Sequence, residues 1–348
     1  MDRDYIIVGQ GLAGSVLALT LMSKGATVMV INQTNPNSSS MVAGGLYNPI
    51  TGKEMKVTWL AERLFPALHS FYTKAEELTG AIFLHPMPIY RPFLSVQEQN
   101  DWMAKSAEPK YSAFVEAIFS TSQYGTHLHD SYGGILLKQG GFLDVPVFLE
   151  ACKKYLLEQG AYMEDIFQND DLILGTDQVN YRKITAGRII YCNGLAVLDS
   201  PYFEWLPFRP VKGEILQGAF SKPHNIIFNR GVFVLPYKGN MSKVGATYNW
   251  QDLSNEPTEK ARMELLEKLD KLMAIPFDIV EQKTGIRPAT KDRRPFIGLH
   301  PTQKLLGIFN GFGAKGVSLA PYFAEQLAMC MEQKTAIDHE VNINRCFF

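Results

Sequence analysis

The N-terminal part of the chain alternates between short apolar blocks and a glycine-rich turn. Residues 5–8 form an uninterrupted run of apolar, strand-forming side chains, which is typical of a central parallel strand covered on both faces. Apolar residues between 16 and 21 predict a helix that ends at Lys24-Gly25, and residues 27–31 predict a second strand. The pattern therefore predicts a strand, a glycine turn, a helix and a strand within about thirty residues.

The rest of the chain contains shorter strands and a second turn of the same kind. Strands are predicted at 226–228, 232–235 and 243–248, and residues 238–240 form a turn between two of them. Residues 259–273 have the apolar spacing of a helix. Near the far end, an apolar strand at 306–310 leads through a second glycine-rich turn into a helical stretch at 322–331.

Gly9, Gly11 and Gly14 give the first turn the GxGxxG spacing of dinucleotide-binding proteins. Gly9 permits the tight turn, Gly11 lets the backbone approach a pyrophosphate, and Gly14 lets the helix pack closely on the sheet. The helix start at Leu12 and Ala13 offers free N–H groups and the positive end of a helix dipole. We therefore predict a dinucleotide site; the alternative is a glycine turn without a ligand.

Asn32 follows the second predicted strand, where dinucleotide-binding proteins usually carry an acidic residue that binds the ribose hydroxyls. An amide oxygen still accepts one such hydrogen bond, and the missing charge removes repulsion toward a 2′-phosphate. The N-terminal pattern thus predicts adenosine binding without distinguishing FAD, NAD and NADP.

Composition narrows the class of protein. The chain has 348 residues, more than a single core usually accommodates, so two structural domains are expected. A formal net charge of -1 gives no global electrostatic case for binding nucleic acid or an anionic membrane. Four scattered cysteines have no metal-ligand or disulfide-framework spacing, so we expect reduced thiols and no metal site. Because neither a leader pattern nor an apolar span of about 18 residues occurs, we predict a soluble cytoplasmic protein without a membrane span.

Two stretches in the C-terminal third carry a family resemblance. Residues 285–298 read GIRPATKDRRPFIG, and residues 306–321 read LGIFNGFGAKGVSLAP. With the N-terminal motif, they resemble the D-amino-acid oxidase superfamily of FAD enzymes, within it glycine oxidase and the flavin domain of the bifunctional enzyme that modifies carboxymethylaminomethyl-uridine in tRNA. The other matching stretches are SSS at 38–40, GGLYNP at 44–49, GGFLD at 140–144, IIYCNG at 189–194, PVKGE at 210–214 and GATY at 245–248.

The resemblance implies an α/β fold: a Rossmann-like FAD-binding domain with a discontinuous, mostly antiparallel α+β substrate domain. It assigns residues 1–83, 136–212 and 284–348 to the FAD-binding domain, and residues 84–135 and 213–283 to the substrate domain. No cysteine stands just before Arg287, where relatives with covalent flavin carry one, so non-covalent FAD is expected. The cofactor-binding residues that follow are Gly9, Gly11, Leu12, Ala13, Gly14, Asn32, Ser39, Ser40, Ala43, Gly44, Gly45, Leu46, Gly194, Gly311, Phe312, Gly313, Ala314, Lys315, Gly316 and Val317.

The resemblance also implies a chemistry, in which FAD accepts a hydride from the carbon next to an amine and water hydrolyses the resulting imine. Arg287 stands where the glycine oxidase family binds the substrate carboxylate, and a guanidinium holds a carboxylate through two parallel hydrogen bonds. The alternative for Arg287 is a structural ion pair. The turn at 311–316 would face the pyrimidine edge of the flavin, with Lys315 as either an extra cation or a solvated side chain.

Three tyrosines, Tyr248, Tyr237 and Tyr47, are candidates to line the flavin face and bind substrate, although aromatic residues usually serve packing first. Burial beside a flavin would lower the pKa of the substrate amine, so no dedicated base is required.

Three hypotheses for the function follow. The first is FAD-dependent oxidation of the C–N bond of a small amino acid or secondary amine that carries a carboxylate. The second is a tRNA wobble-uridine modifying flavoenzyme that removes a carboxymethyl group, and the third is a non-catalytic dinucleotide-binding protein. The basic run of Lys291, Arg293 and Arg294 is either a solvated turn or a contact to tRNA phosphates. The oligomeric state is left open.

Overall fold

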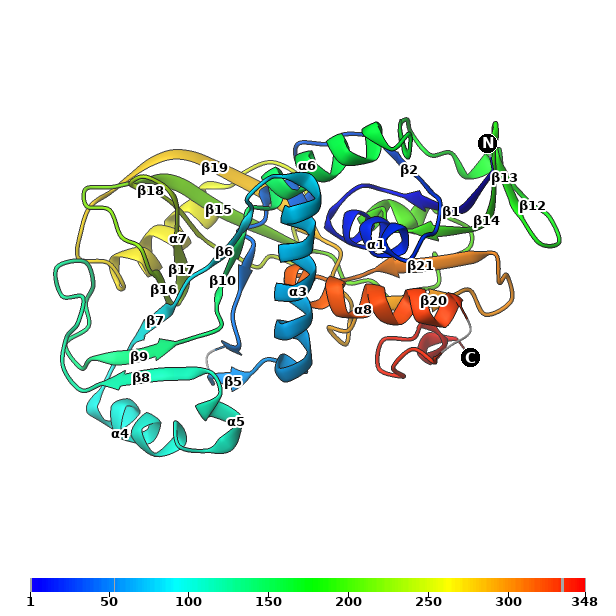
Figure 1. Ribbon diagram of the computed structural model, residues 1–348. Helices are drawn as coiled ribbons and strands as arrows, with labels where there is room; N and C mark the ends of the chain where they lie inside the picture. Colours follow the sequence, from blue (N-terminus) through cyan, green and yellow to red (C-terminus); the bar gives the residue numbers. More distant parts are fainter. Residues whose placement is uncertain (1, 53, 333–334, 348) are drawn as a thin grey trace.

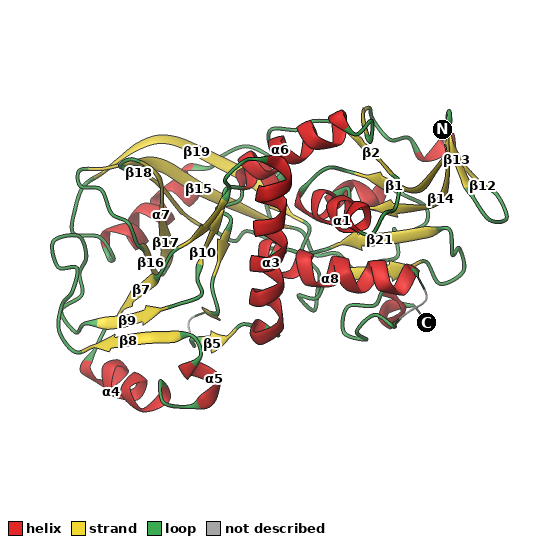
Figure 2. Cartoon of the chain, viewed as in Figure 1, coloured by secondary structure: helices red, strands yellow, loops and turns green. Residues whose placement is uncertain are grey.

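The computed structural model describes residues 2–52, 54–332 and 335–347. Two lobes, each built around an eight-stranded sheet, lie on either side of helix α3 (Ala61–Thr79), and both chain ends lie in the same lobe (Figure 1). Figure 2 shows that helices flank the strands of both lobes. The mixed α/β architecture agrees with the predicted fold class.

The first sheet carries the N-terminal motif. Its strand order is β11-β2-β1-β14-β13-β12, with β21 beside β14 and β20 beside β21. The centre is parallel, because β1 pairs with β2 and β14, and β14 pairs with β21. Ile6 and Ile7 of β1 have no exposed surface, as predicted for a strand covered on both faces. The strands are β1 (Asp2–Val8), β2 (Val28–Asn32), β11 (Tyr162–Glu164), β12 (Leu172–Leu174), β13 (Val179–Tyr181), β14 (Ile184–Tyr191), β20 (Phe296–Leu299) and β21 (Leu306–Asn310).

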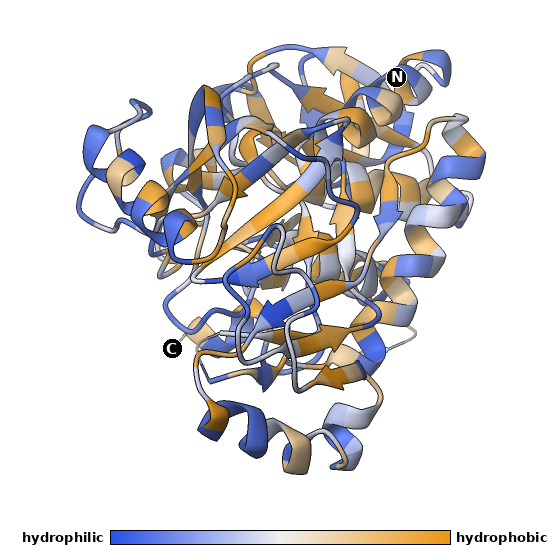
Figure 3. Ribbon diagram, turned by 90° about the vertical axis from the view of Figure 1, so that its left-hand side faces the viewer, coloured by the Kyte–Doolittle hydropathy of each residue, from blue (hydrophilic) through white to orange (hydrophobic). Residues whose placement is uncertain are grey.

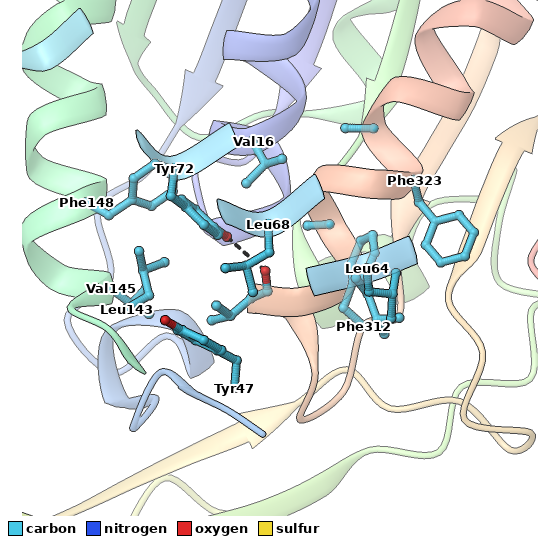
Figure 4. Packing of buried hydrophobic residues seen from close by; sticks show 14 of the residues in the cluster. Val16, Tyr47, Leu64, Leu68, Tyr72, Leu143, Val145, Phe148, Phe312 and Phe323 are labelled. Atoms are coloured by element: carbon cyan, nitrogen blue, oxygen red, sulfur yellow. Dashed lines mark hydrogen bonds between the residues drawn. The ribbon is translucent and has the colours of Figure 1, made fainter. Parts of the chain in front are cut away.

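Two helices from opposite ends of the chain pack on this sheet and on each other: α1 (Leu12–Ser23) and α8 (Gly316–Met331). The second helix begins at Gly316, earlier than the stretch predicted at 322–331. Apolar side chains of α3, α6 (Val145–Glu158) and α8 form a shared core (Figure 4). Within it, the Tyr72 hydroxyl of α3 donates a hydrogen bond of 3.2 Å to the Val317 carbonyl, which fixes the first turn of α8.

The second sheet has the order β19-β15-β18-β17-β16-β7-β9-β8. All neighbours are antiparallel except β16 and β7, so the prediction of a mostly antiparallel sheet is confirmed. Viewed toward this lobe, apolar residues concentrate on the strands, and hydrophilic residues concentrate on the surrounding loops and helices (Figure 3). The strands are β7 (Ile89–Pro92), β8 (Val115–Phe119), β9 (Gly134–Leu137), β15 (Val211–Phe220), β16 (Ile227–Arg230), β17 (Val232–Lys238), β18 (Met241–Gly245) and β19 (Phe277–Arg287).

Two predicted elements end earlier than expected. The strand expected at 243–248 ends at Gly245, because the next residues leave the regular ladder and bond to β15 irregularly, with the Asn249 N–H donating to the Lys212 carbonyl at 2.9 Å. Helix α7 (Glu259–Asp270) is shorter than the predicted 259–273. Its apolar face covers one side of the second sheet.

Shorter elements join the two lobes. The remaining strands are β3 (Leu46–Tyr47), β6 (Leu84–Pro86) and β10 (Gly141–Leu143), which form a three-stranded sheet, and the pair β4 (Ile50–Thr51) and β5 (Lys56–Val57). The remaining helices are α2 (Ser39–Val42), α4 (Val96–Lys105), α5 (Pro109–Ser112) and the short 3-10 turns at Asn169–Asp171, Gly194–Asp199 and Ile343–Cys346.

Candidate active site

A cavity of about 1340 Å³ is lined by residues of both lobes. This volume exceeds the roughly 300–1,000 Å³ of an ordinary small-molecule site, so the cavity has room for a dinucleotide together with a substrate. Among the described residues, every cofactor or substrate residue expected from the sequence lines the cavity except Gly14, Gly311 and Tyr237.

The two glycine-led helix starts meet at this cavity. A β-carbon added to Gly316, the first residue of α8, would lie 2.8 Å from Cδ2 of Leu12, the first residue of α1. Neither helix has a side-chain cap from its own N-cap residue, although the Leu12 N–H donates to Ser40 Oγ at 3.1 Å. The positive ends of both helices therefore lie at the same cavity.

The glycines of the first turn fit a dinucleotide. Gly9 has a φ of +96°, and a β-carbon there would lie 2.8 Å from the Asn193 Cα. A β-carbon on Gly14 would overlap the Gly9 carbonyl, whereas one on Gly11 would meet only Ser40 Oγ, at 3.2 Å. Beside this turn, the buried Oδ1 of Asn193 has no hydrogen-bond partner among the described residues. An open backbone face and an unsatisfied polar atom are what a bound pyrophosphate and sugar would complete.

Asn32 supports the turn itself. Its Oδ1 accepts a hydrogen bond of 2.8 Å from the Gln10 N–H, and its Nδ2 donates to the Tyr162 hydroxyl at 3.3 Å. The amide oxygen expected to bind ribose therefore also holds the glycine loop against the end of β2.

The segment expected along the flavin runs between the lobes. Ser39 and Val42 of α2 contact β19, where a β-carbon on Gly285 would lie 3.2 Å from the Val42 Cβ. Gly45 has a φ of +73°, and a β-carbon on Gly44 would lie 2.7 Å from Cζ of Phe233. The Phe233 ring leaves little room for a side chain at Gly44, and the positive φ together with the nearby Leu143 backbone disfavours one at Gly45.

The second glycine turn places a cation at the cavity. Gly311 and Gly313 have φ values of +80° and +55°. Lys315 is accessible from the cavity, and its Nζ lies 3.4 Å from Oγ1 of both Thr51 and Thr58. Surrounding protein, and secondarily Arg294 and Arg293, lower the pKa of Lys315. An anion in the cavity would therefore be attracted to this lysine.

Arg287 ends β19 at the cavity wall. Its guanidinium occupies the space where a β-carbon on Gly213 would stand, and its Nη1 donates to the Thr247 carbonyl at 3.3 Å. The guanidinium carbon lies 4.7 Å from the centre of the Tyr248 ring. Burial lowers the pKa of Arg287, opposed by Tyr248. No carboxylate of the described residues forms an ion pair with Arg287, so its charge remains available to a ligand.

The three tyrosines have different surroundings. Tyr248 is 53% exposed and stacks at 6.2 Å on the exposed Trp250, so it stands at the cavity mouth. Tyr47, which is labelled in Figure 4, is buried in the core, and its ring contacts the rings of Phe65 and His69. Tyr237 points toward Gln217, with its hydroxyl 3.4 Å from Oε1, and does not line the cavity.

Phe233, on the same strand as Tyr237, lines the cavity instead. Since residues at i and i+4 of a strand face the same side, the sequence pattern alone did not distinguish the two aromatic residues.

A buried charge cluster anchors the segment after Tyr248. Lys212 has no exposed surface, and its Nζ donates to Asp252 Oδ2 at 2.6 Å, Ser254 Oγ at 3.1 Å and the Glu256 carbonyl at 2.6 Å. Residues 249–258 are thereby tied to β15. No local sequence signal pointed to this cluster, because its members meet only in the folded chain.

The basic run has a structural use. The Arg294 guanidinium lies 3.8 Å from the centre of the Trp59 ring, and its Nε lies 3.4 Å from Glu340 Oε1. Among the described residues there is no cluster of acidic, histidine or cysteine side chains that could hold a metal ion. Within the same residues, no helix combines the length and the hydrophobicity that crossing a bilayer demands.

The chain is similar to several known proteins. The chain is 26% identical over 361 residues to the bifunctional protein ThiO/ThiG of Nostoc sp., covering 96% of this chain and 54% of that protein. It is 22% identical over 354 residues to the tRNA 5-methylaminomethyl-2-thiouridine biosynthesis bifunctional protein MnmC of Marinobacter nauticus, covering 93% of this chain and 54% of that protein. The chain thus spans about half the length of the curated relatives it matches.

The fold has a close structural counterpart. Glycine oxidase from Bacillus cereus superimposes with a TM-score of 0.76 at 19% identity, covering 96% of both chains. The family model for FAD dependent oxidoreductases matches residues 4–329. Because this match covers most of the chain, the chain belongs to this family of FAD-dependent oxidoreductases.

Proposed function

We propose that this chain oxidises the C–N bond of a small amino acid or secondary amine that carries a carboxylate, with FAD as the electron acceptor. The observation that carries the proposal is Arg287, a cation at the cavity wall that has no carboxylate partner among the described residues. Membership in an oxidoreductase family disfavours the third hypothesis, a non-catalytic dinucleotide-binding protein.

The chain's own groups have distinct tasks in this proposal. FAD, when bound, supplies the acceptor for a hydride from the carbon next to the nitrogen, and water then hydrolyses the imine. Arg287 fixes the carboxylate and thereby the angle of the reacting carbon. The turn at 311–316, the start of α8 and Lys315 stabilise negative charge at the far side of the site. The apolar wall formed by Ile215 and Phe233 favours the neutral amine, whose lone pair assists hydride loss.

Non-covalent attachment of FAD is part of the proposal. Cys192 is the cysteine among the residues that line the cavity, and burial raises the pKa of its thiol well above the usual range. A buried neutral thiol is a poor nucleophile. It also lies at the Gly9 and Gly14 turn, 3.3 Å from where a β-carbon on Gly14 would stand, which is the expected pyrophosphate end.

A tRNA carboxymethylaminomethyl-uridine is the second candidate substrate. The exposed pair of Tyr248 and Trp250 at the cavity mouth supports it, because a nucleobase stacks readily on an aromatic surface. The similarity to MnmC also supports it. The formal net charge of -1 speaks against extended contacts to a phosphate backbone.

Anaerobic reduction of the flavin separates these candidates. The purified chain is mixed without oxygen with glycine, sarcosine, D-amino acids or carboxymethylaminomethyl-modified tRNA, and flavin absorbance is followed. Bleaching by the small amines supports the first candidate. Bleaching by the tRNA alone supports the second, and no bleaching with any of them contradicts both.

A further inference from the structure

A second arginine, Arg91, lines the same cavity on the other part of the second sheet. Side chains alternate along β7, so Ile89 and Arg91 face the cavity, whereas Tyr90 faces the core behind the sheet and donates to Asp130 Oδ2 at 3.0 Å. The partner of Arg91 on the neighbouring strand β9 is Ile135, which has no exposed surface. The neighbour of Arg91 on the β9 side is therefore apolar.

Arg91 lacks the partners that a guanidinium in such a setting normally has. Its Nε is buried without a hydrogen-bond partner, and its guanidinium forms no hydrogen bond or ion pair with the described residues. Burial, with a smaller contribution from Arg230, lowers the pKa of Arg91 to about 10, opposed by Glu98. A buried polar atom without a partner is costly, and a ligand or a water molecule would satisfy it.

The other cations on this side of the cavity are already neutralised. Arg230 Nη1 lies 2.6 Å from Glu98 Oε1, Lys268 Nζ lies 2.5 Å from Glu264 Oε1, and Lys271 Nζ lies 2.6 Å from Glu267 Oε1. A polyanion such as an RNA backbone would need several free cations in a row. One free guanidinium fits one anionic group.

Position along the sheet limits the ligand further. The Arg287 guanidinium lies over Gly213 of β15, and β15 and β7 are separated by β18, β17 and β16. Four strand spacings correspond to about 19 Å measured along the sheet. The distance between the two guanidinium groups is shorter, because both side chains project into the cavity and the sheet is twisted. A compact diacid does not span this distance.

We propose that Arg91 binds a second anionic group of the substrate, which is therefore an extended amine with one carboxylate for Arg287 and a further carboxylate or phosphate on a tether of several bonds. This inference rests on the proposed amine oxidation and narrows its substrate class. It separates this site from one built for glycine alone, since glycine has no group that reaches Arg91.

The reactive test uses a series of N-carboxymethyl amines whose nitrogen carries an alkyl chain of increasing length. Each chain ends in a carboxylate, a phosphate or a neutral amide, and iminodiacetate is the shortest diacid. For the longer members we expect the anionic ends to bind roughly tenfold to hundredfold more tightly than the amides in anaerobic flavin reduction. The carboxylate and phosphate series identify which anion is preferred. Equal affinity for anionic and amide ends at every length overturns the proposal.

Variants locate the effect. Arg91→Met should remove the preference for anionic ends while leaving the affinity for amide-ended amines and the flavin content unchanged. Arg91→Lys should keep part of the preference for anionic ends. Lys271 lines the same side of the cavity but is paired with Glu267, so Lys271→Met is the matched control. It should change neither the preference for anionic ends nor the flavin content. Loss of flavin from Arg91→Met, or an equal loss for anionic and amide ends, would show a cofactor or structural role and would overturn the proposal.

A binding experiment keeps this inference separate from the proposed function. Unreactive straight-chain dicarboxylates and monocarboxylates of matched length are titrated into the flavin-loaded protein, and the shift of the flavin spectrum is measured. Tighter binding of the long dicarboxylates that Arg91→Met abolishes supports the anion site, even if no amine reduces the flavin. Absence of that difference contradicts the anion site, even if amines do reduce it.

Discussion

The guanidinium of Arg287 fills the space above Gly213 where any other residue would carry a β-carbon. The arginine end of β19 is thus held against the backbone of β15, and the Thr247 carbonyl and the Tyr248 ring hold it from the other side. Position, rather than charge alone, makes this arginine suited to orient a carboxylate.

Gly213→Ala should therefore displace the guanidinium without removing it. A misplacement of about 1 Å costs on the order of 100-fold in turnover, so kcat/KM for carboxylated amines should fall by roughly that factor. Flavin content should stay unchanged. Gly187→Ala on β14 is the control, since its added β-carbon would meet only the Asp4 carbonyl, at 3.1 Å. Unaltered kinetics in Gly213→Ala would contradict the assigned role of Arg287.

Arg287→Lys keeps the charge but loses the two-pronged geometry. We expect kcat/KM for carboxylated substrates to fall by roughly 30-fold or more, which corresponds to about 2 kcal/mol, with flavin retained. Amines without a carboxylate, measured in parallel, should be affected little. If both substrate types decline together, Arg287 serves the fold rather than the carboxylate.

Tyr248 acts on Arg287 through the face of its ring, so its hydroxyl should matter little. Tyr248→Phe should resemble the natural protein, whereas Tyr248→Leu should raise KM about fivefold, the effect of losing a cation–π contact of about 1 kcal/mol. Steady-state kinetics with one carboxylated amine provide the comparison. A large loss in Tyr248→Phe would assign the hydroxyl a direct contact to substrate.

Asn32 should affect cofactor affinity through the turn that it supports. Asn32→Ala leaves the N–H of the buried Gln10 without its acceptor, at a cost of about 1–3 kcal/mol, and should weaken FAD binding accordingly. Asn32→Asp preserves the acceptor and should bind FAD more tightly than Asn32→Ala. Fluorescence of released FAD measures both dissociation constants, and equal values for the two variants would contradict this role.

Lys315 should give the cofactor-free protein a pH-dependent stability at alkaline pH. The folded protein lowers the pKa of Lys315 below its ordinary 10.5, so the unfolded chain binds the proton more tightly. The free energy of unfolding should therefore rise as pH increases from the lowered pKa toward about 10.5. Lys315→Met should flatten this rise in denaturant titrations. Lys304→Met, an exposed lysine that does not line the cavity, should retain it.

The same lysine should tune the flavin if it lies beside the ring. The positive charge of Lys315 would stabilise the negative charge of reduced flavin. Lys315→Met should therefore make the midpoint potential of bound flavin more negative by about 30 mV, equivalent to about 1.4 kcal/mol for two electrons. Lys304→Met should leave the potential unchanged. An unaltered potential in Lys315→Met would place the lysine away from the developing charge.

Local sequence patterns predicted the secondary-structure elements that depend on residues close together in the chain. The strand, glycine turn and helix around Gly9 follow from residue types within one short stretch, and so do β16, β17 and β18 of the second sheet. The second role of Asn32 did not, because its partner, the Gln10 N–H, comes near only when β2 lies beside β1. The family resemblance found Arg287, and no sequence signal found Gly213 as its support.

Arg91 was missed for a related reason. A single charged residue in a strand of alternating apolar and polar residues matches no sequence motif. Whether such a residue is free to bind a ligand depends on whether the fold brings a carboxylate close to it. Tyr237 illustrates the converse, since it was predicted to line the flavin face, whereas Phe233 lines the cavity. Side-chain surroundings, rather than element types, limited the prediction of the site.

The contact between Leu12 and Gly316 has a consequence for biosynthesis. A ribosome delivers the first glycine loop before its counterpart on α8, because all strands of both sheets except β1 are encoded between them. FAD loading in the proposed site must therefore await the synthesis of α8. Incompletely synthesised chains would lack part of the proposed FAD site. The cellular supply of FAD would then influence how much of the newly made protein acquires its cofactor.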